Sequence, residues 1–230
     1  MKKFNLLFIS VLFISTISCS NDEGNNPSKL KIINESSSNN NEATFTSITI
    51  KGSIIETNSN SISSRGICWS KTPNPTINNN ILTLESNIIN NEISNLSVNT
   101  MYYFRIFAIV NNKIIYGENI SSSTLSLENS KWRFATYYPE GAFSSGTTIE
   151  STVNFYADRT TKFDEIGIGQ GVFITYGSWS LNDNFLTYIW EGNNPNTSTY
   201  VYTGTINGMT IQGTFTHPST PGTWTATLTD

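Results

Sequence analysis

The sequence predicts an all-β protein that consists of a β-sandwich followed by a small antiparallel β-barrel. Asn, Ser and Thr each occur 30 times among the 230 residues, and these residue types favour turns, caps and strands over helix interiors. Short runs of alternating apolar residues are separated by clusters of Asn, Ser, Pro and Gly, which is the pattern of short strands joined by turns. The length allows two domains of ordinary size.

The charge balance excludes some partners. The chain has 13 basic and 17 acidic residues and a net charge of −4, so it lacks the excess of cations that neutralises nucleic acid phosphates. Only 37% of the residues are hydrophobic, which argues against a protein with many membrane spans. We expect no nucleic acid partner.

The N-terminus has the layout of a secretory signal peptide. A cationic start, Met1 to Lys3, precedes an apolar run from Phe4 to Ile17. This run is shorter than the roughly 20 residues that a membrane-spanning helix needs. We expect residues 1–18 to be a signal peptide and the polar residues 19–28 to be a tether.

Ser18-Cys19 resembles the lipobox of bacterial lipoproteins, and Ser20 to Glu23 resemble the surface-export tag of Bacteroidetes-type bacteria. The resemblance implies lipidation at Cys19 and a location on the outer membrane or cell surface, with the membrane as a partner through the acyl anchor. The alternative is an ordinary signal peptide with an incidental cysteine. Cys68 is the only other cysteine, and its strand-like surroundings predict a buried thiol without a disulfide partner.

Residues 29–126 form the first predicted domain. Its clearest strand-like runs cover 44–50, 62–69, 102–110 and 114–116. Around the third run, alternate positions carry apolar side chains that we assign to one buried face: Leu96, Tyr102, Phe104, Ile106 and Ala108.

Two motifs in this part resemble fibronectin type III domains. Leu96 to Ala108 is similar to the tyrosine corner and the strand after it, and Ser64 to Thr76 is similar to a strand and turn of the fibronectin-like repeats in secreted Bacteroidetes proteins. The resemblance implies a fibronectin type III-like β-sandwich in which the hydroxyl of Tyr102 makes a hydrogen bond with the preceding loop.

Residues 130–230 form the second predicted domain, which is richer in aromatic residues and holds four of the five Trp. One strand begins at Trp132, and the others are expected at 148–156, 160–163, 171–181, 185–190, 200–206, 209–216 and 222–228. Asn207-Gly208 predicts a tight hairpin in which both residues have positive φ. About eight strands in about 100 residues predict an up-and-down barrel.

This second domain resembles the lipocalin-like family of small secreted barrels. The motifs that carry the resemblance include Ser130-Lys131-Trp132, Gly177-Ser178-Trp179-Ser180 and Gly222-Thr223-Trp224-Thr225. Ser130 stands where lipocalins carry Gly. The resemblance implies a lipocalin-like β-barrel, whose interior is either filled with side chains or holds one small ligand.

The chain offers few residues for catalysis. His217 is the only histidine and lies in a Pro-rich turn, while Asp158 and Asp164-Glu165 lie in a turn and a loop. Ser-His-Asp sets, multi-histidine metal sites and paired glycosidase carboxylates need such groups on a rigid scaffold. Residues 182–184 could offer oxygen ligands to Ca²⁺, but turn chemistry explains them better. We predict no enzyme activity, no metal and no cofactor.

Binding is a better use of the aromatic residues in the second domain. Exposed aromatic rings beside amide groups suit sugar rings, although strand alternation also sends many rings into the core. The candidate ligand-binding residues are Tyr176, Tyr188, Trp190, Tyr200 and Tyr202. The leading hypothesis is a non-enzymatic binding, adhesion or scaffold lipoprotein with a protein partner. The alternatives are a carrier of a small apolar ligand in the barrel and a glycan-binding accessory protein.

Overall fold

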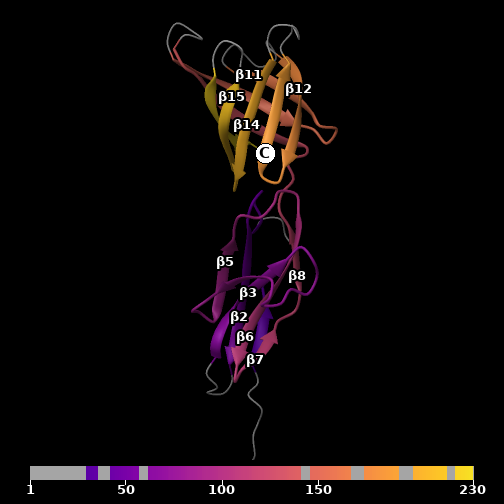
Figure 1. Ribbon diagram of the computed structural model, residues 1–230, viewed down its shortest axis with the longest axis vertical. Helices are drawn as coiled ribbons and strands as arrows, with labels where there is room; N and C mark the ends of the chain where they lie inside the picture. The colour runs from indigo at the N-terminus through magenta and orange to yellow at the C-terminus, as the bar shows by residue number, and fades with distance from the viewer. Residues whose placement is uncertain are drawn as a thin grey trace, which may run out of the picture.

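The computed structural model describes residues 30–35, 42–56, 62–140, 146–166, 174–191, 199–216 and 221–229. The fold is all-β, as the sequence predicts: two sheets built from β1 to β8 are followed by a closed barrel built from β9 to β16. The two parts are stacked end to end (Figure 1). The expected signal peptide, Cys19, the tether and His217 lie outside the described residues.

The first eight strands form two antiparallel sheets. The first sheet has the order β1-β2-β5, and in the second, of order β4-β3-β6-β7, β8 also pairs with β6. The bounds are β1 Leu30–Asn34, β2 Ile48–Glu56, β3 Ile62–Ser70, β4 Asn80–Thr83, β5 Ile88–Ile93, β6 Met101–Val110, β7 Lys113–Tyr116 and β8 Ile120–Ser123. The sequence pattern did not indicate β1, β4, β5 or β8.

The buried face that alternation predicts around β6 is confirmed. The core between the two sheets contains the five residues assigned to that face together with isoleucines of β2, β3 and β5. The hydroxyl of Tyr102 accepts a hydrogen bond of 3.0 Å from the backbone N–H of Ser97, so the expected tyrosine corner is present. Cys68 is fully buried, and burial raises the pKa of its thiol to about 11.

The last eight strands close into an antiparallel barrel. Each strand pairs with the next along the chain, and β16 pairs with β9 to complete the circle. The bounds are β9 Ser130–Tyr138, β10 Thr147–Phe155, β11 Thr160–Glu165, β12 Ile174–Asn182, β13 Phe185–Glu191, β14 Thr199–Asn207, β15 Thr210–Thr216 and β16 Gly222–Leu228. Closure leaves the barrel without an edge strand.

The predicted hairpin between β14 and β15 is present, but its turn lies one residue later than expected. Asn207 pairs with Thr210, so the two loop residues are Gly208 and Met209. Gly208 has φ of 57°, and it alone of these two has a positive φ. Glycine at the first loop position is the pattern of a type II′ turn, so the expectation of positive φ at both Asn207 and Gly208 was wrong.

Aromatic side chains fill much of the barrel interior. Phe134 lies at the centre of the cluster: its ring is stacked on Trp224 with centroids 4.7 Å apart and meets the rings of Phe155, Tyr188 and Tyr202 at 6.1 to 6.3 Å. Trp132 is fully buried, and its indole N–H donates a 2.8 Å hydrogen bond to Ser130. The serine at this position therefore anchors a core tryptophan.

Candidate functional site

The junction between the sandwich and the barrel is built from side chains rather than from a loose linker. Phe45 belongs to the segment before β2, yet it is 1% exposed and its ring centroid lies 5.1 Å from that of Trp132 in the barrel. Phe45, Val98 and Leu127 all join the hydrophobic core of the barrel. The two domains thus have separate cores, but loops of the first close the near end of the second.

Hydrogen bonds fix the same junction on two sides. Asn184 accepts a 3.1 Å bond from the backbone N–H of Val98 and donates a 3.1 Å bond to the carbonyl of Leu96. The turn at Gly208 donates to the hydroxyl of Thr46 at 2.7 Å and accepts from the N–H of Phe45 at 3.2 Å. Two hairpin turns of the barrel are therefore bonded to two loops of the sandwich.

The connecting segment is also held. The N–H of Leu125 donates to the carbonyl of Thr44 at 2.9 Å, and the N–H of Asn99 donates to the carbonyl of Leu125 at 3.0 Å. The hydroxyl of Thr124 donates a 2.7 Å bond to the carbonyl of Ser97. A linker bonded in this way restricts the motion of the barrel relative to the sandwich.

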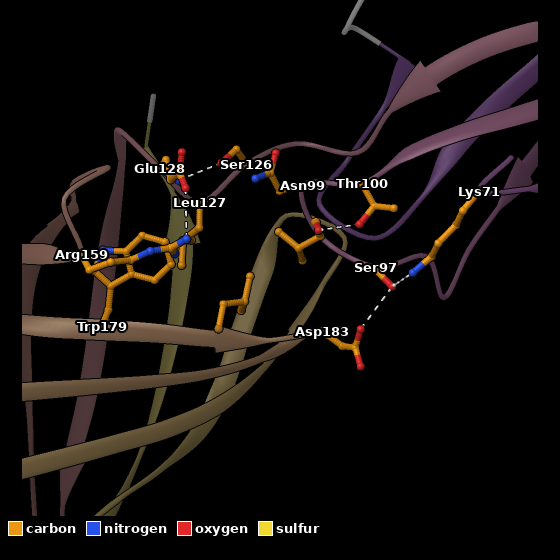
Figure 2. A pocket seen from close by; sticks show the side chains of 12 residues that line it. Lys71, Ser97, Asn99, Thr100, Ser126, Leu127, Glu128, Arg159, Trp179 and Asp183 are labelled. Carbon is orange, nitrogen blue, oxygen red and sulfur yellow. Dashed lines mark hydrogen bonds and ion pairs between the residues drawn. The ribbon is translucent and has the colours of Figure 1, made fainter.

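A pocket of about 210 Å³ opens at this junction. Its lining includes Val98 and Leu127 from the sandwich side and Trp179 and Leu181 from the barrel. Its charged side chains are Lys71, Glu128, Arg159 and Asp183 (Figure 2).

The charges around this junction pocket are balanced by contacts within it. The guanidinium of Arg159 lies 4.1 Å from the ring centroid of Trp179 and 3.2 Å from a carboxylate oxygen of Glu128. Ser97 accepts a 3.2 Å bond from Lys71 and donates a 3.4 Å bond to Asp183, as Figure 2 shows. Because the lining carries two cationic and two acidic side chains, the pocket has no excess of one charge that would select an ion. Arg159 covers the face of Trp179, so that ring is not a platform for a sugar.

The five predicted binding residues do not share one surface. Tyr188 and Tyr202 are 0% and 3% exposed and lie stacked in the barrel core, with centroids 5.2 Å apart. Trp190 and Tyr200 are half-buried on the inner face toward the barrel end that lies away from the sandwich, with centroids 4.5 Å apart. Tyr176 is 65% exposed and points outward from β12.

Tyrosine hydroxyls give the inner face of the barrel a polar side. Burial raises the pKa of Tyr138, Tyr188, Tyr200 and Tyr202, so these phenols stay protonated at neutral pH. The hydroxyls of Tyr138 and Tyr202 lie 3.5 Å apart. These groups can donate and accept hydrogen bonds, but they are poor bases.

Of the other acidic candidates, Asp158 and Asp183 serve turns, whereas Asp164 and Glu165, which the sequence assigned to a loop, lie in β11. Asp158 accepts bonds of 2.6 Å and 3.0 Å from the hydroxyl and N–H of Thr160, which hold the pKa of its carboxyl below the ordinary value. Asp183 has φ of 51° in the two-residue turn between β12 and β13. Among the described residues, no group of three or more His, Cys, Asp or Glu is placed to hold a metal ion.

The functional residue that sequence reasoning missed is Asn184. It lies in a segment that turn chemistry explains, and nothing in the local sequence marks the bonds that its amide makes to Leu96 and Val98. An Asn at the second position of a tight turn was the one available signal.

Comparison of the chain with models of protein families, with curated proteins and with solved structures found no match. Within the described ranges, no helix has the length and apolar character that a membrane crossing requires.

Proposed function

We propose that the protein is a lipid-anchored, non-enzymatic binding or scaffold module of the outer membrane or cell surface. In this proposal Cys19 carries the anchor, the fibronectin type III-like sandwich is a spacer, and the lipocalin-like barrel is the end that meets a partner. The proposal rests on the direction in which the chain runs through the two domains.

One observation carries it: the chain enters the sandwich at the end that lies away from the barrel. Leu30, the first described residue, pairs with Glu56 at the last position of β2. The other end of β2, at Ile48, follows the loop that contacts the barrel through Thr46. Nine residues of β2 span about 30 Å, so an anchor upstream of Leu30 would join the chain at the end of the sandwich that lies about that far from the barrel.

The bonded junction supports the same role. A spacer that bends freely would let the barrel fall back toward the membrane. The contacts of Phe45 and Asn184 keep the barrel in line with the sandwich (Figure 1). The packed rings around Phe134 favour this display role over that of a carrier for an apolar ligand.

The test is the location of the Cys19→Ser variant in cells of the source organism. The wild-type protein should partition with the outer membrane and be cut by protease added to intact cells, whereas Cys19→Ser should be released. Cys68→Ala is the matched control, since it removes the other cysteine and should remain on the membrane. Release of the wild-type protein, or retention of Cys19→Ser, would contradict the proposal.

Glycan binding is a second candidate, favoured by the half-buried pair of Trp190 and Tyr200 toward the far end of the barrel. A pull-down on insoluble glycans should retain the wild-type protein and lose Trp190→Ala. Tyr176→Ala is the control for a ring on the outer face. Equal retention of Trp190→Ala and the wild-type protein would show that Trp190 takes no part in glycan binding.

A further inference from the structure

Two charged side chains of the junction pocket are not paired with each other. Lys71 follows β3 of the sandwich, and Asp183 lies in the turn between β12 and β13 of the barrel. Their charged groups meet one hydroxyl: Ser97 accepts a 3.2 Å bond from Lys71 and donates a 3.4 Å bond to Asp183 (Figure 2). Neither side chain forms an ion pair with any residue in the described ranges. Each charge therefore remains available to a ligand group of the opposite charge.

Bonds that the fold already makes hold these two charges in place. The N–H of Ser97 donates a 3.0 Å bond to the hydroxyl of Tyr102, so the tyrosine corner positions the serine. The ammonium group of Lys71 lies 5.8 Å from the ring centroid of the same tyrosine. On the barrel side, Asn184 is bonded to the sandwich as donor and as acceptor, which fixes the turn that carries Asp183. The cation and the anion thus face one pocket from two domains.

The rest of the pocket offers aliphatic surface and a second pair of charges that is already closed. Val98, Leu127 and Leu181 contribute the aliphatic lining. The guanidinium of Arg159 lies 3.2 Å from a carboxylate oxygen of Glu128, so these two charges neutralise each other at the opposite end of the pocket (Figure 2). The volume of about 210 Å³ is below the ~300–1,000 Å³ of pockets for drug-sized ligands, so the pocket suits a smaller molecule.

We propose that the junction pocket binds an α-amino acid with an aliphatic side chain. An α-amino acid carries an ammonium group and a carboxylate on one carbon atom, which matches a cation and an anion placed around one hydroxyl. The ligand carboxylate meets Lys71, its ammonium group meets Asp183, and its side chain lies on Val98 and Leu127. A simple anion or cation satisfies only one of the two charges. Because the ligand contacts both domains, its binding also stabilises the junction.

Calorimetric titration of the wild-type protein with L-leucine tests the proposal. Two control ligands each lack one charge: isocaproate has no amino group, and isoamylamine has no carboxylate. We expect saturable binding of L-leucine and affinities about tenfold or more weaker for both controls, because each loses one hydrogen-bonded contact with a charged side chain. Glycine, which has both charges but no side chain, should also bind about tenfold or more weakly, since it leaves the aliphatic lining uncovered.

Variants test which side chains read the two charges. Lys71→Gln and Asp183→Asn should each weaken the affinity for L-leucine by about tenfold. Both residues are exposed, and asparagine tolerates the φ of 51° at position 183, so an unchanged Tm without ligand should confirm that the variants fold. Lys113→Gln is the matched control, because it removes an exposed lysine on β7, at the end of the sandwich away from the barrel (Figure 1), and should bind like the wild-type protein.

Three results would overturn the proposal. One is the absence of saturable binding of L-leucine up to about 10 mM. Another is an equal affinity for L-leucine in the wild-type protein, Lys71→Gln and Asp183→Asn, which would show that these charges take no part. The third is a control ligand or glycine that binds as tightly as L-leucine, since the pocket would then not recognise both charges and the side chain together.

Discussion

The role of Phe45 can be tested by removing its ring. Phe45 belongs to the sandwich in sequence but to the barrel core in space, where it is 1% exposed and packs on Trp132 at 5.1 Å. Truncation of a buried Phe to Ala costs about 3–5 kcal/mol, because apolar contacts are lost and a cavity remains. We expect Phe45→Ala to lower the free energy of unfolding of the barrel by about that amount.

Urea denaturation followed by tryptophan fluorescence measures this effect. Four of the five Trp lie in the second domain, so a Trp69→Phe background makes the signal report on the barrel alone. Ile88→Ala is the control, since Ile88 is 76% exposed on β5 of the sandwich and its truncation should change stability little. An unchanged barrel transition in Phe45→Ala would refute the argument, because it would mean that the barrel core closes without the sandwich.

Three further predictions concern the junction, the barrel wall and the buried thiol. Asn184→Ala should lower the free energy of unfolding by about 1–3 kcal/mol in urea denaturation, since it leaves the N–H of Val98 and the carbonyl of Leu96 unpaired. Asn184→Asp keeps only the acceptor, so its stability should lie between those of the wild-type protein and Asn184→Ala. An unchanged urea midpoint for both variants would contradict these bonds. Gly213→Ala should lower the free energy of unfolding by about 1–3 kcal/mol or more in the same assay, because its Cβ would lie 1.8 Å from the carbonyl oxygen of Thr203. If the variant were as stable as the wild-type protein, the strands would have to separate readily at this position. Cys68, whose thiol pKa is raised to about 11, should resist maleimide at pH 8 until the protein unfolds, and rapid labelling of the native protein would contradict its burial. The folded state keeps a proton that the unfolded state releases from about pH 9, so the free energy of unfolding should fall as the pH rises from 9 through 11.

Strand alternation allowed much of the fold to be predicted. The period of two placed Leu96 and Ala108 correctly in the sandwich core, because one face of an antiparallel sheet is buried and the pattern records it. The hairpin at Gly208 was predicted correctly, but its register was not. A turn at Asn207-Gly208 and a turn at Gly208-Met209 differ only in which residues pair across the two strands.

The candidate site was harder to predict, because it depends on which face a ring occupies. Tyr188 and Trp190 share the inner face of β13, and Tyr200 and Tyr202 share that of β14, as even spacing requires. Tyr176 is three residues from the buried Trp179, and this odd spacing already places it on the outer face. The role of Asn184 depends on a tertiary contact that no local pattern encodes.

The most direct test of the account is the distance distribution between spin labels on the two domains. In a Cys19→Ser background, Ile81→Cys on β4 and Thr225→Cys on β16 give two exposed labelling sites, while buried Cys68 should stay unlabelled. We predict one narrow distance distribution, which should broaden in Asn184→Ala and in Phe45→Ala. A broad distribution in the protein with both junction residues intact would show that the barrel swings freely and would contradict a fixed display of the barrel.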